Sequence, residues 1–180
     1  MGVDNSSLLN SNKVMVVMGS DSDLPVVKAA VDFLEEMAIP FEVHVSSAHR
    51  AAAKTETLAK NAVANGFAVI IAAAGGAAHL AGVIAAQTTL PVIGIPVKSG
   101  ALQGMDALYA TVQMPPGIPV ATVAIDGARN AAILAAQILG ITDRQISEKI
   151  AALKNKMAED IEKKDTKLQS LGVAEYLAQK

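Results

Sequence analysis

Short β-branched runs alternate five times with alanine-rich stretches of helical length, and this alternation restricts the fold more than any other feature of the chain. The run "KVMVVM" at 13–18 precedes a helical stretch at 25–37, and "FEVHV" at 41–45 precedes another at 51–66. Three more pairs follow: 68–74 with 77–89, 91–97 with 102–113, and 119–125 with 128–140. Strands that alternate with helices form a parallel sheet through right-handed crossovers. We therefore predict an α/β fold with helices on both faces of the sheet.

The expected helix ends agree with this division of the chain. Asp23 or Ser22 is placed to cap the first helix, with Pro25 just inside it. Gly66 and Gly140 stand where helix C-terminal caps belong. The helix ends indicated by these capping residues thus coincide with those given by the alternation of strands and helices.

A single domain is expected, because one core typically serves about 100–200 residues and this chain has 180. Apolar residues make up 52% of the chain and aromatic residues 3%, so the core must consist mainly of Ala, Val, Ile and Leu. Residues 1–12 are rich in Ser and Asn and are expected to form a disordered lead-in to a domain at 13–180.

A long amphipathic helix is predicted from Thr142 onward, because apolar residues recur there at steps of three and four. They are Ile146, Ile150, Leu153, Met157 and Ile161. The sequence leaves two alternatives open for this helix. It either lies on its own domain or packs on another subunit.

Charge and composition exclude several classes of partner. The net charge of −2 gives no general attraction to nucleic acid or to an anionic membrane. No cysteine is present, which agrees with a reducing compartment, so a cytoplasmic location is expected. Lys60 to Lys98 encloses an uncharged stretch long enough to span a membrane, but Gly75, Gly76 and Pro91 interrupt it. Buried strands and a helix explain that stretch better.

The loop after the first strand is "GSDSD", Gly19 to Asp23, and it leads directly into a helix. Free N–H groups at a helix start favour an anion. Because the loop lacks both the phosphate-loop and the dinucleotide fingerprints, ATP and NAD are not supported, and a single phosphate is the remaining candidate. Asp21 and Asp23 would better accept hydrogen bonds from sugar hydroxyls. Taken alone, this loop favours the alternative of a capped turn with solvated carboxylates.

The loop after the second strand, "SSAHR", combines two kinds of chemistry. Arg50 offers a bidentate grip on phosphate or carboxylate, and His49 can move a proton near neutral pH. Ser46 and Ser47 add hydroxyl groups. No serine lies in a nucleophile elbow. His44, His49 and His79 lack the spacing of a metal site, so no metal is expected, and His79 fits a hydrogen-bonded core histidine.

The loop after the third strand, within "AAAGGAAHLAG", carries almost no side chains. Paired glycines let a ligand approach the backbone closely, and the alanines predict a small, dry pocket. Close packing of helix on sheet is the alternative. Pro115, Pro116 and Pro119 are expected to form a stiff rim after the fourth helix.

Several stretches, in the same order along the chain as in the family, together resemble the class I PurE family, the N5-carboxyaminoimidazole ribonucleotide mutases of purine biosynthesis. They are "VMGSDSD", "SSAHR", "IIAAAGGAAHLAGVIAAQTTLPVIGIPV", "VQMPPGIPVATVAI" and "NAAILAAQIL", from about Lys13 to Leu139. The resemblance implies a flavodoxin-like fold and a homo-octamer that acts on a small-molecule nucleotide. It also implies that a carboxylate moves from the exocyclic nitrogen to the adjacent ring carbon, giving 4-carboxy-5-aminoimidazole ribonucleotide without metal, ATP or another cofactor.

The resemblance also implies roles for individual residues. The family's catalytic acid/base histidine falls on His49, and its substrate-binding serine, aspartate and arginine fall on Ser20, Asp23 and Arg50. Further positions that line the family's pocket fall on Ser22, Ser47, Ala48, Gly75, His79 and Leu80.

Three departures from the family pattern concern helix entry and a rim loop. Arg50 is followed by "AAAK" instead of Thr-Pro-Asp, Ala81 replaces a proline, and "AIDGARNAA" is shorter than the usual connection. They lie outside the matched site residues, so we expect them to affect affinity and loop order more than reaction type.

Three other functions remain as alternatives. The first is a class II enzyme that carboxylates aminoimidazole ribonucleotide directly with CO₂, although that class usually has lysine where this chain has Arg50. The second is a non-catalytic flavodoxin-like module that binds FMN or a mononucleotide. The third is a purely structural oligomer.

Overall fold

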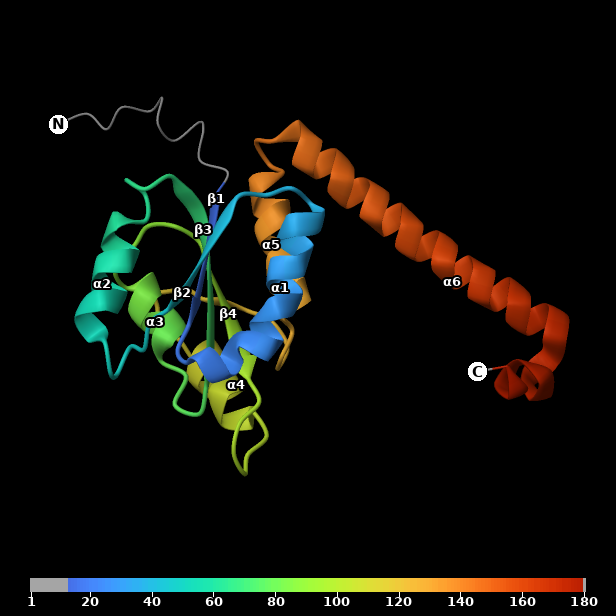
Figure 1. Cartoon of the computed structure of the whole chain (residues 1–180), viewed down its shortest axis with the longest axis horizontal. Helices are drawn as coiled ribbons and strands as arrows, with labels where there is room; N and C mark the ends of the chain where they lie inside the picture. Colours follow the sequence, from blue (N-terminus) through green and yellow to red (C-terminus); the bar gives the residue numbers. More distant parts are fainter. Residues whose placement is uncertain (1–12, 180) are drawn as a thin grey trace.

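Five parallel strands form one sheet in the computed structural model, which describes residues 13–179 (Figure 1). The strands are β1 (Lys13–Met18), β2 (Phe41–Val45), β3 (Phe67–Gly75), β4 (Val92–Val97) and β5 (Ala121–Thr122). Their order in the sheet is β2-β1-β3-β4-β5, and every neighbouring pair is parallel. This is the flavodoxin-like order, so the predicted fold class is confirmed. The lead-in predicted at 1–12 lies outside the described residues.

Helices cover both faces of the sheet (Figure 1). They are α1 (Leu24–Glu36), α2 (Ala52–Asn61), α3 (Leu80–Ala85), α4 (Met105–Val112), α5 (Ala128–Leu139) and α6 (Arg144–Ala178), with a short 3-10 helix η2 (Asp21–Asp23) before α1. One face carries α1 and α5, and the opposite face carries α2 and α3. The result is the predicted arrangement of three layers.

Apart from Lys13 at the start of β1, the central strands β1, β3 and β4 carry no charged or polar side chain, as expected for strands that are buried on both faces. In β1, Val14 and Val16 pack with α1 and α5, whereas Met15 and Val17 pack with α2 and α3. Alanine dominates the inward face of α5, where the buried side chains are Ala128, Ala131, Ala132, Ala135, Ala136 and Leu139. Such small side chains let the helix approach the sheet closely, as the composition indicated.

Several predicted elements are shorter in the structure. The strand expected at 119–125 is reduced to β5, because Pro119 has no N–H to donate and the chain turns at Asp126, whose φ is +58°. Beyond β5, Val123 N–H still donates to the Gly94 carbonyl. The helix expected at 51–66 ends at Asn61, and turns lead from there to Gly66 with φ +79°.

Only the first turns of α6 rest on the body of the protein. Ile146 and Ile150 are buried and Leu153 packs against them, whereas Met157 and Ile161 are 50% and 63% exposed. Figure 1 shows the rest of α6 extending away from the sheet. The alternative that this helix lies on its own domain is therefore wrong beyond Leu153, and packing on another subunit stays a prediction. No helix within 13–179 is long and apolar enough to cross a membrane.

The start of α2 lacks a side-chain cap, which is a consequence of the departure at "AAAK". Ala51 stands at the N-cap and has no side chain that can accept from the free N–H groups of the first turn. We expect Ala51→Ser to raise the free energy of unfolding by about 0.5–1 kcal/mol. Chemical denaturation at fixed protein concentration measures this change. The matched control is Ala53→Ser inside the same helix, where serine only lowers helix propensity. Equal stability of the two variants would contradict the prediction.

Candidate active site

A cavity of about 380 Å³ lies at the carboxyl ends of β1, β2, β3 and β4. The strand order reverses between β1 and β3, and open parallel sheets bind ligands at that point. All ten residues predicted for the site line this cavity: Ser20, Ser22, Asp23, Ser47, Ala48, His49, Arg50, Gly75, His79 and Leu80. Three separate loops therefore meet as the resemblance implied.

The first loop is held in shape by its own side chains. The Ser20 hydroxyl oxygen accepts from the Ser22 N–H at 3.3 Å, and the Asp23 carboxylate accepts from the Ser20 N–H at 3.3 Å. Asp23 stands at the N-cap of α1, as predicted, although its side chain makes no capping hydrogen bond to α1, and Pro25 lies in the first turn. The carboxylate of Asp23 turns back because the 3-10 turn η2 intervenes before the helix.

Asp23 is 8% exposed, which is unusual for a carboxylate. Burial raises the pKa of the Asp23 carboxyl above its ordinary value. Hydrogen bonds from Ser20 and Ser22 and the positive charge of Arg50 oppose this rise of the pKa. Asp23 is thus a buried hydrogen-bond acceptor at the cavity wall.

In the "SSAHR" loop, one serine stabilises the fold and the other residues line the cavity. Ser46 is 1% exposed and its hydroxyl bonds to the Thr55 hydroxyl at 2.8 Å, so it anchors α2 and does not reach the cavity. The Ser47 hydroxyl oxygen accepts from the Arg50 N–H at 3.2 Å, which fixes the turn.

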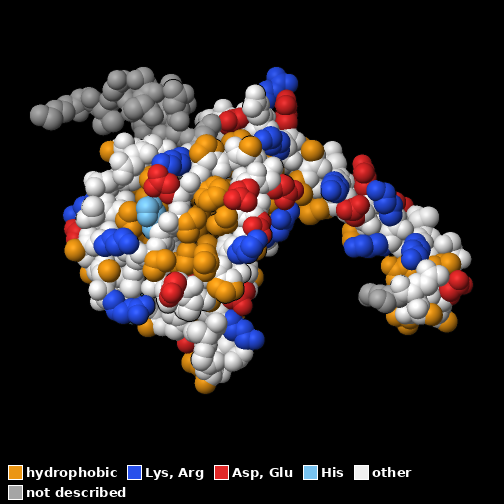
Figure 2. Space-filling model, viewed as in Figure 1, with side chains coloured by type: hydrophobic (Ala, Val, Ile, Leu, Met, Phe, Trp, Pro, Cys, Tyr) orange, Lys and Arg blue, Asp and Glu red, His pale blue; other side chains and the backbone are white. Residues whose placement is uncertain are grey.

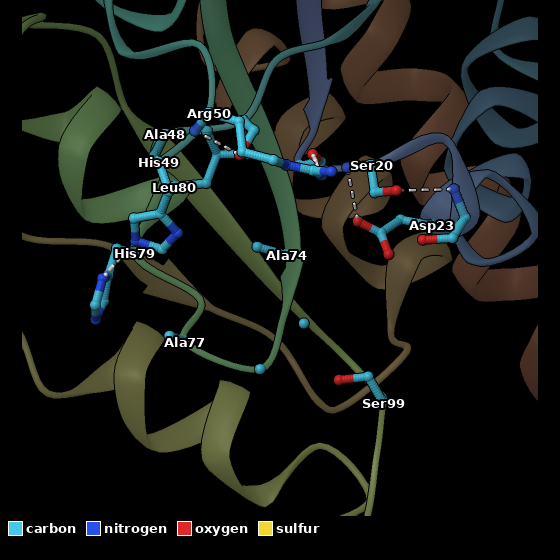
Figure 3. Close-up of a pocket in the computed structure, with 15 residues that line it drawn as sticks. Ser20, Asp23, Ala48, His49, Arg50, Ala74, Ala77, His79, Leu80 and Ser99 are labelled. Atoms are coloured by element: carbon cyan, nitrogen blue, oxygen red, sulfur yellow. Dashed lines mark hydrogen bonds between the residues drawn. The ribbon is translucent and has the colours of Figure 1, made fainter.

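The Arg50 side chain reaches across to the first loop (Figure 3). Its Nη2 donates to the Gly19 carbonyl at 3.3 Å. Within residues 13–179, no carboxylate lies within ion-pair distance of Arg50. Most N–H groups of the guanidinium therefore remain available for an anion beside Ser20.

His49 and His79 come from different loops and meet at the cavity edge. His49 Nε2 lies 2.9 Å from His79 Nδ1, and the two rings are edge to face with centroids 5.0 Å apart. His79 is exposed, so the prediction of a core histidine is wrong, although its hydrogen bond is present. His44 lies away from the cavity and bonds to Glu42. Across the described part of the chain, no cluster of three or more possible metal ligands occurs.

The third loop forms a wall almost free of side chains. A Cβ on Gly75 would lie 2.8 Å from the Ser99 Oγ and 3.1 Å from the Val97 carbonyl oxygen, so a larger residue here would have to displace Ser99 and press on the backbone of β4. Gly76 has φ +62°, a conformation that glycine adopts without strain. The wall at Gly75 and Gly76 carries no polar side chain and the cavity is open on one side, so a dry pocket stays a prediction.

Ala74 and Ala77, from the alanine-rich stretch expected at the pocket, line the cavity, and so does Ser99, which was not among the predicted site residues. Ser99 follows β4, and the rule that ligands lie at carboxyl ends of strands would have indicated it. The proline loop at 115–119, predicted as a rim, contributes no residue to the cavity formed by the described residues.

The chain has relatives over most of its length. Residues 13–160 match the family model described as AIR carboxylase. The N5-carboxyaminoimidazole ribonucleotide mutase of Thermotoga maritima is 52% identical over 93% of this chain and 98% of that protein. The phosphoribosylaminoimidazole carboxylase of Saccharomyces cerevisiae is 48% identical, but this chain spans 29% of that longer protein. The crystal structure of Treponema denticola PurE superposes with a TM-score of 0.80 at 29% identity, over 87% of this chain and 98% of that one.

Proposed function

This chain belongs to the AIR carboxylase family, and from that premise we propose that it is an N5-carboxyaminoimidazole ribonucleotide mutase of purine biosynthesis. The observation that carries the proposal is the match to the mutase of Thermotoga maritima, which includes 98% of that protein at 52% identity. The carboxylase name of the yeast relative belongs to a much longer protein. It therefore carries less weight for a chain of this length.

The substrate is an anionic nucleotide, and the cavity offers a group for each of its parts. Arg50 and Ser20 would hold the ribose phosphate, since both face the same side of the cavity (Figure 3). Asp23 would accept hydrogen bonds from the ribose hydroxyls. The migrating carboxylate would lie against the backbone of Gly75 and Gly76, where nothing projects from the wall.

The first chemical step breaks the bond between the exocyclic nitrogen and the carboxylate. Loss of CO₂ from a carbamate disperses negative charge, so an apolar wall favours it over water. The nucleotide itself would cover the open side of the cavity in this mechanism. The released CO₂ then stays beside the ring carbon, which is nucleophilic like an enamine carbon, and a new carbon–carbon bond forms.

Protons balance within one cycle. His49 donates a proton to the departing nitrogen and afterwards removes one from the ring carbon that has attacked CO₂. The net result is an isomerisation that exchanges a proton and a carboxylate between nitrogen and carbon. It consumes neither ATP nor a redox cofactor.

We also propose that residues 13–180 act as one cytoplasmic domain within a homo-octamer. Exposed apolar side chains on the far part of α6, among them Met157 and Ile161, support assembly. In the single chain these side chains face water, and Figure 2 shows apolar side chains at the far end of this helix.

Direct carboxylation of aminoimidazole ribonucleotide is the second candidate, favoured by the name of the yeast relative. The purified full-length chain should be offered each substrate separately, without added metal or ATP. We expect conversion of the carbamate to the carbon-linked carboxylate, measured by the ultraviolet absorbance of the product. Efficient use of the free amine plus CO₂, with no use of the carbamate, would overturn the mutase proposal. Tightly bound flavin and no turnover would favour a binding module instead.

A further inference from the structure

The hydrogen bond between the two cavity histidines decides which atom of His49 can meet the substrate. His49 Nε2 lies 2.9 Å from His79 Nδ1, within hydrogen-bond distance. Figure 3 shows the two rings side by side, with His79 on the far side of His49 from Ser20 and Asp23. Because Nε2 is engaged, Nδ1 is the ring nitrogen of His49 that remains free for proton transfer.

The direction of this bond follows from the work that His49 must do. A base needs a lone pair at the nitrogen that faces the substrate. For Nδ1 to carry that lone pair in the neutral ring, the proton of His49 must sit on Nε2. Nε2–H then donates to His79 Nδ1, which must itself be unprotonated. When His49 holds its second proton, the same bond stabilises the positive ring.

We propose that His79 is a positioning residue, whose Nδ1 accepts a hydrogen bond from His49 Nε2–H and so keeps His49 Nδ1 free for the substrate. This inference rests on the proposed function. It assigns His79 a role through His49 instead of the direct substrate contact expected from the sequence. The arrangement resembles other catalytic bases that are oriented by a third group.

The position of His79 suits this role. It is the last residue before α3, and its carbonyl accepts from the Val83 N–H at 2.9 Å. Its neighbours Ala78 and Leu80 are 1% and 2% exposed, so the backbone on both sides is anchored in the core. The exposed ring is thus held from a fixed point, and the residues before it, at 74–77, have no polar side chain that competes for His49.

Two substitutions of His79 by residues of similar size distinguish loss of the hydrogen-bond acceptor from loss of side-chain volume. In His79→Asn the amide oxygen takes nearly the place of Nδ1 and still accepts, whereas His79→Leu accepts nothing. We expect His79→Leu to lower kcat by about 10- to 100-fold with KM changed by less than about threefold. His79→Asn should keep kcat within about fivefold of the wild type, because the acceptor is retained. His44→Leu is the matched control and should leave both constants unchanged.

The results distinguish this inference from the proposed function. If the wild type converts neither substrate, the proposed function fails. If the wild type is active and the Asn and Leu variants lose activity equally, the acceptor role is wrong. A rise in KM at constant kcat would show a substrate contact instead and would also overturn it.

A second measurement does not depend on turnover. In ¹⁵N-histidine-labelled wild-type protein, long-range ¹H–¹⁵N spectra report which ring nitrogen of His49 carries the proton. We expect the proton on Nε2 in the neutral ring. A proton on Nδ1 would overturn the inference whether or not the variants fold.

Discussion

Replacing His49 by asparagine should lower kcat by about 10²- to 10⁴-fold or more. Asparagine keeps a polar group at the cavity edge but cannot take up and release a proton near neutral pH. In the proposed mechanism one imidazole serves both proton transfers, so both are lost together. Steady-state turnover of the carbamate measures the effect, and KM should change little.

The control for this substitution is His44→Asn. His44 lies in β2, bonds to Glu42 and does not line the cavity, so its loss should leave turnover unchanged. Thermal denaturation of both variants establishes that the fold is intact. If His49→Asn turned over at nearly the wild-type rate, the acid/base assignment would have to be abandoned.

Replacing Arg50 by methionine should raise KM by about 10- to 100-fold, since each charge-assisted hydrogen bond to an anion contributes about 1.5–3 kcal/mol. Methionine retains much of the side-chain length but removes the guanidinium that faces the cavity beside Ser20. The effect on kcat should be smaller, because the phosphate does not change charge during the reaction. Initial rates over a range of carbamate concentrations separate KM from kcat.

Arg129→Met is the matched control, because Arg129 lies on α5, pairs with Glu36 and does not line the cavity. Arg50→Lys adds a finer comparison. Lysine keeps the charge but loses the planar fork, so its KM should fall between those of wild type and Arg50→Met. An unchanged KM in Arg50→Met would remove Arg50 from the phosphate site.

The sequence predicted the sheet and the meeting of three loops because both depend on local patterns. Apolar runs such as 13–18 mark buried parallel strands, and loops after such strands share one edge of the sheet. Within the first loop, Ser20 and Asp23 have the serine-x-x-acid spacing of a capping box, which is a local sequence pattern for a helical turn that starts after Ser20. The pattern does not indicate that this turn is a separate 3-10 turn that precedes α1.

Other features depend on packing that a single sequence does not encode. The periodicity at Ile146 to Ile161 gave the helix, but not the point at which α6 leaves the body. The place of Ser99 after β4 could have been predicted, but its contact with Gly75 depends on how β3 and β4 pair. His79 was taken for a core residue because alanines and a leucine surround it in sequence, while its ring lies outside the core.

The first loop also has a thermodynamic consequence for affinity. Ser20, Ser22 and Asp23 are hydrogen-bonded to one another, so contacts within the loop itself hold its shape. Binding of a nucleotide does not have to order a flexible loop, so little conformational entropy is lost at this loop on binding. The ligand must instead compete with hydrogen bonds that are already made. The fixed shape of the loop favours binding, whereas its internal hydrogen bonds oppose it. A nucleotide that matches the loop well is therefore favoured over one that matches it poorly.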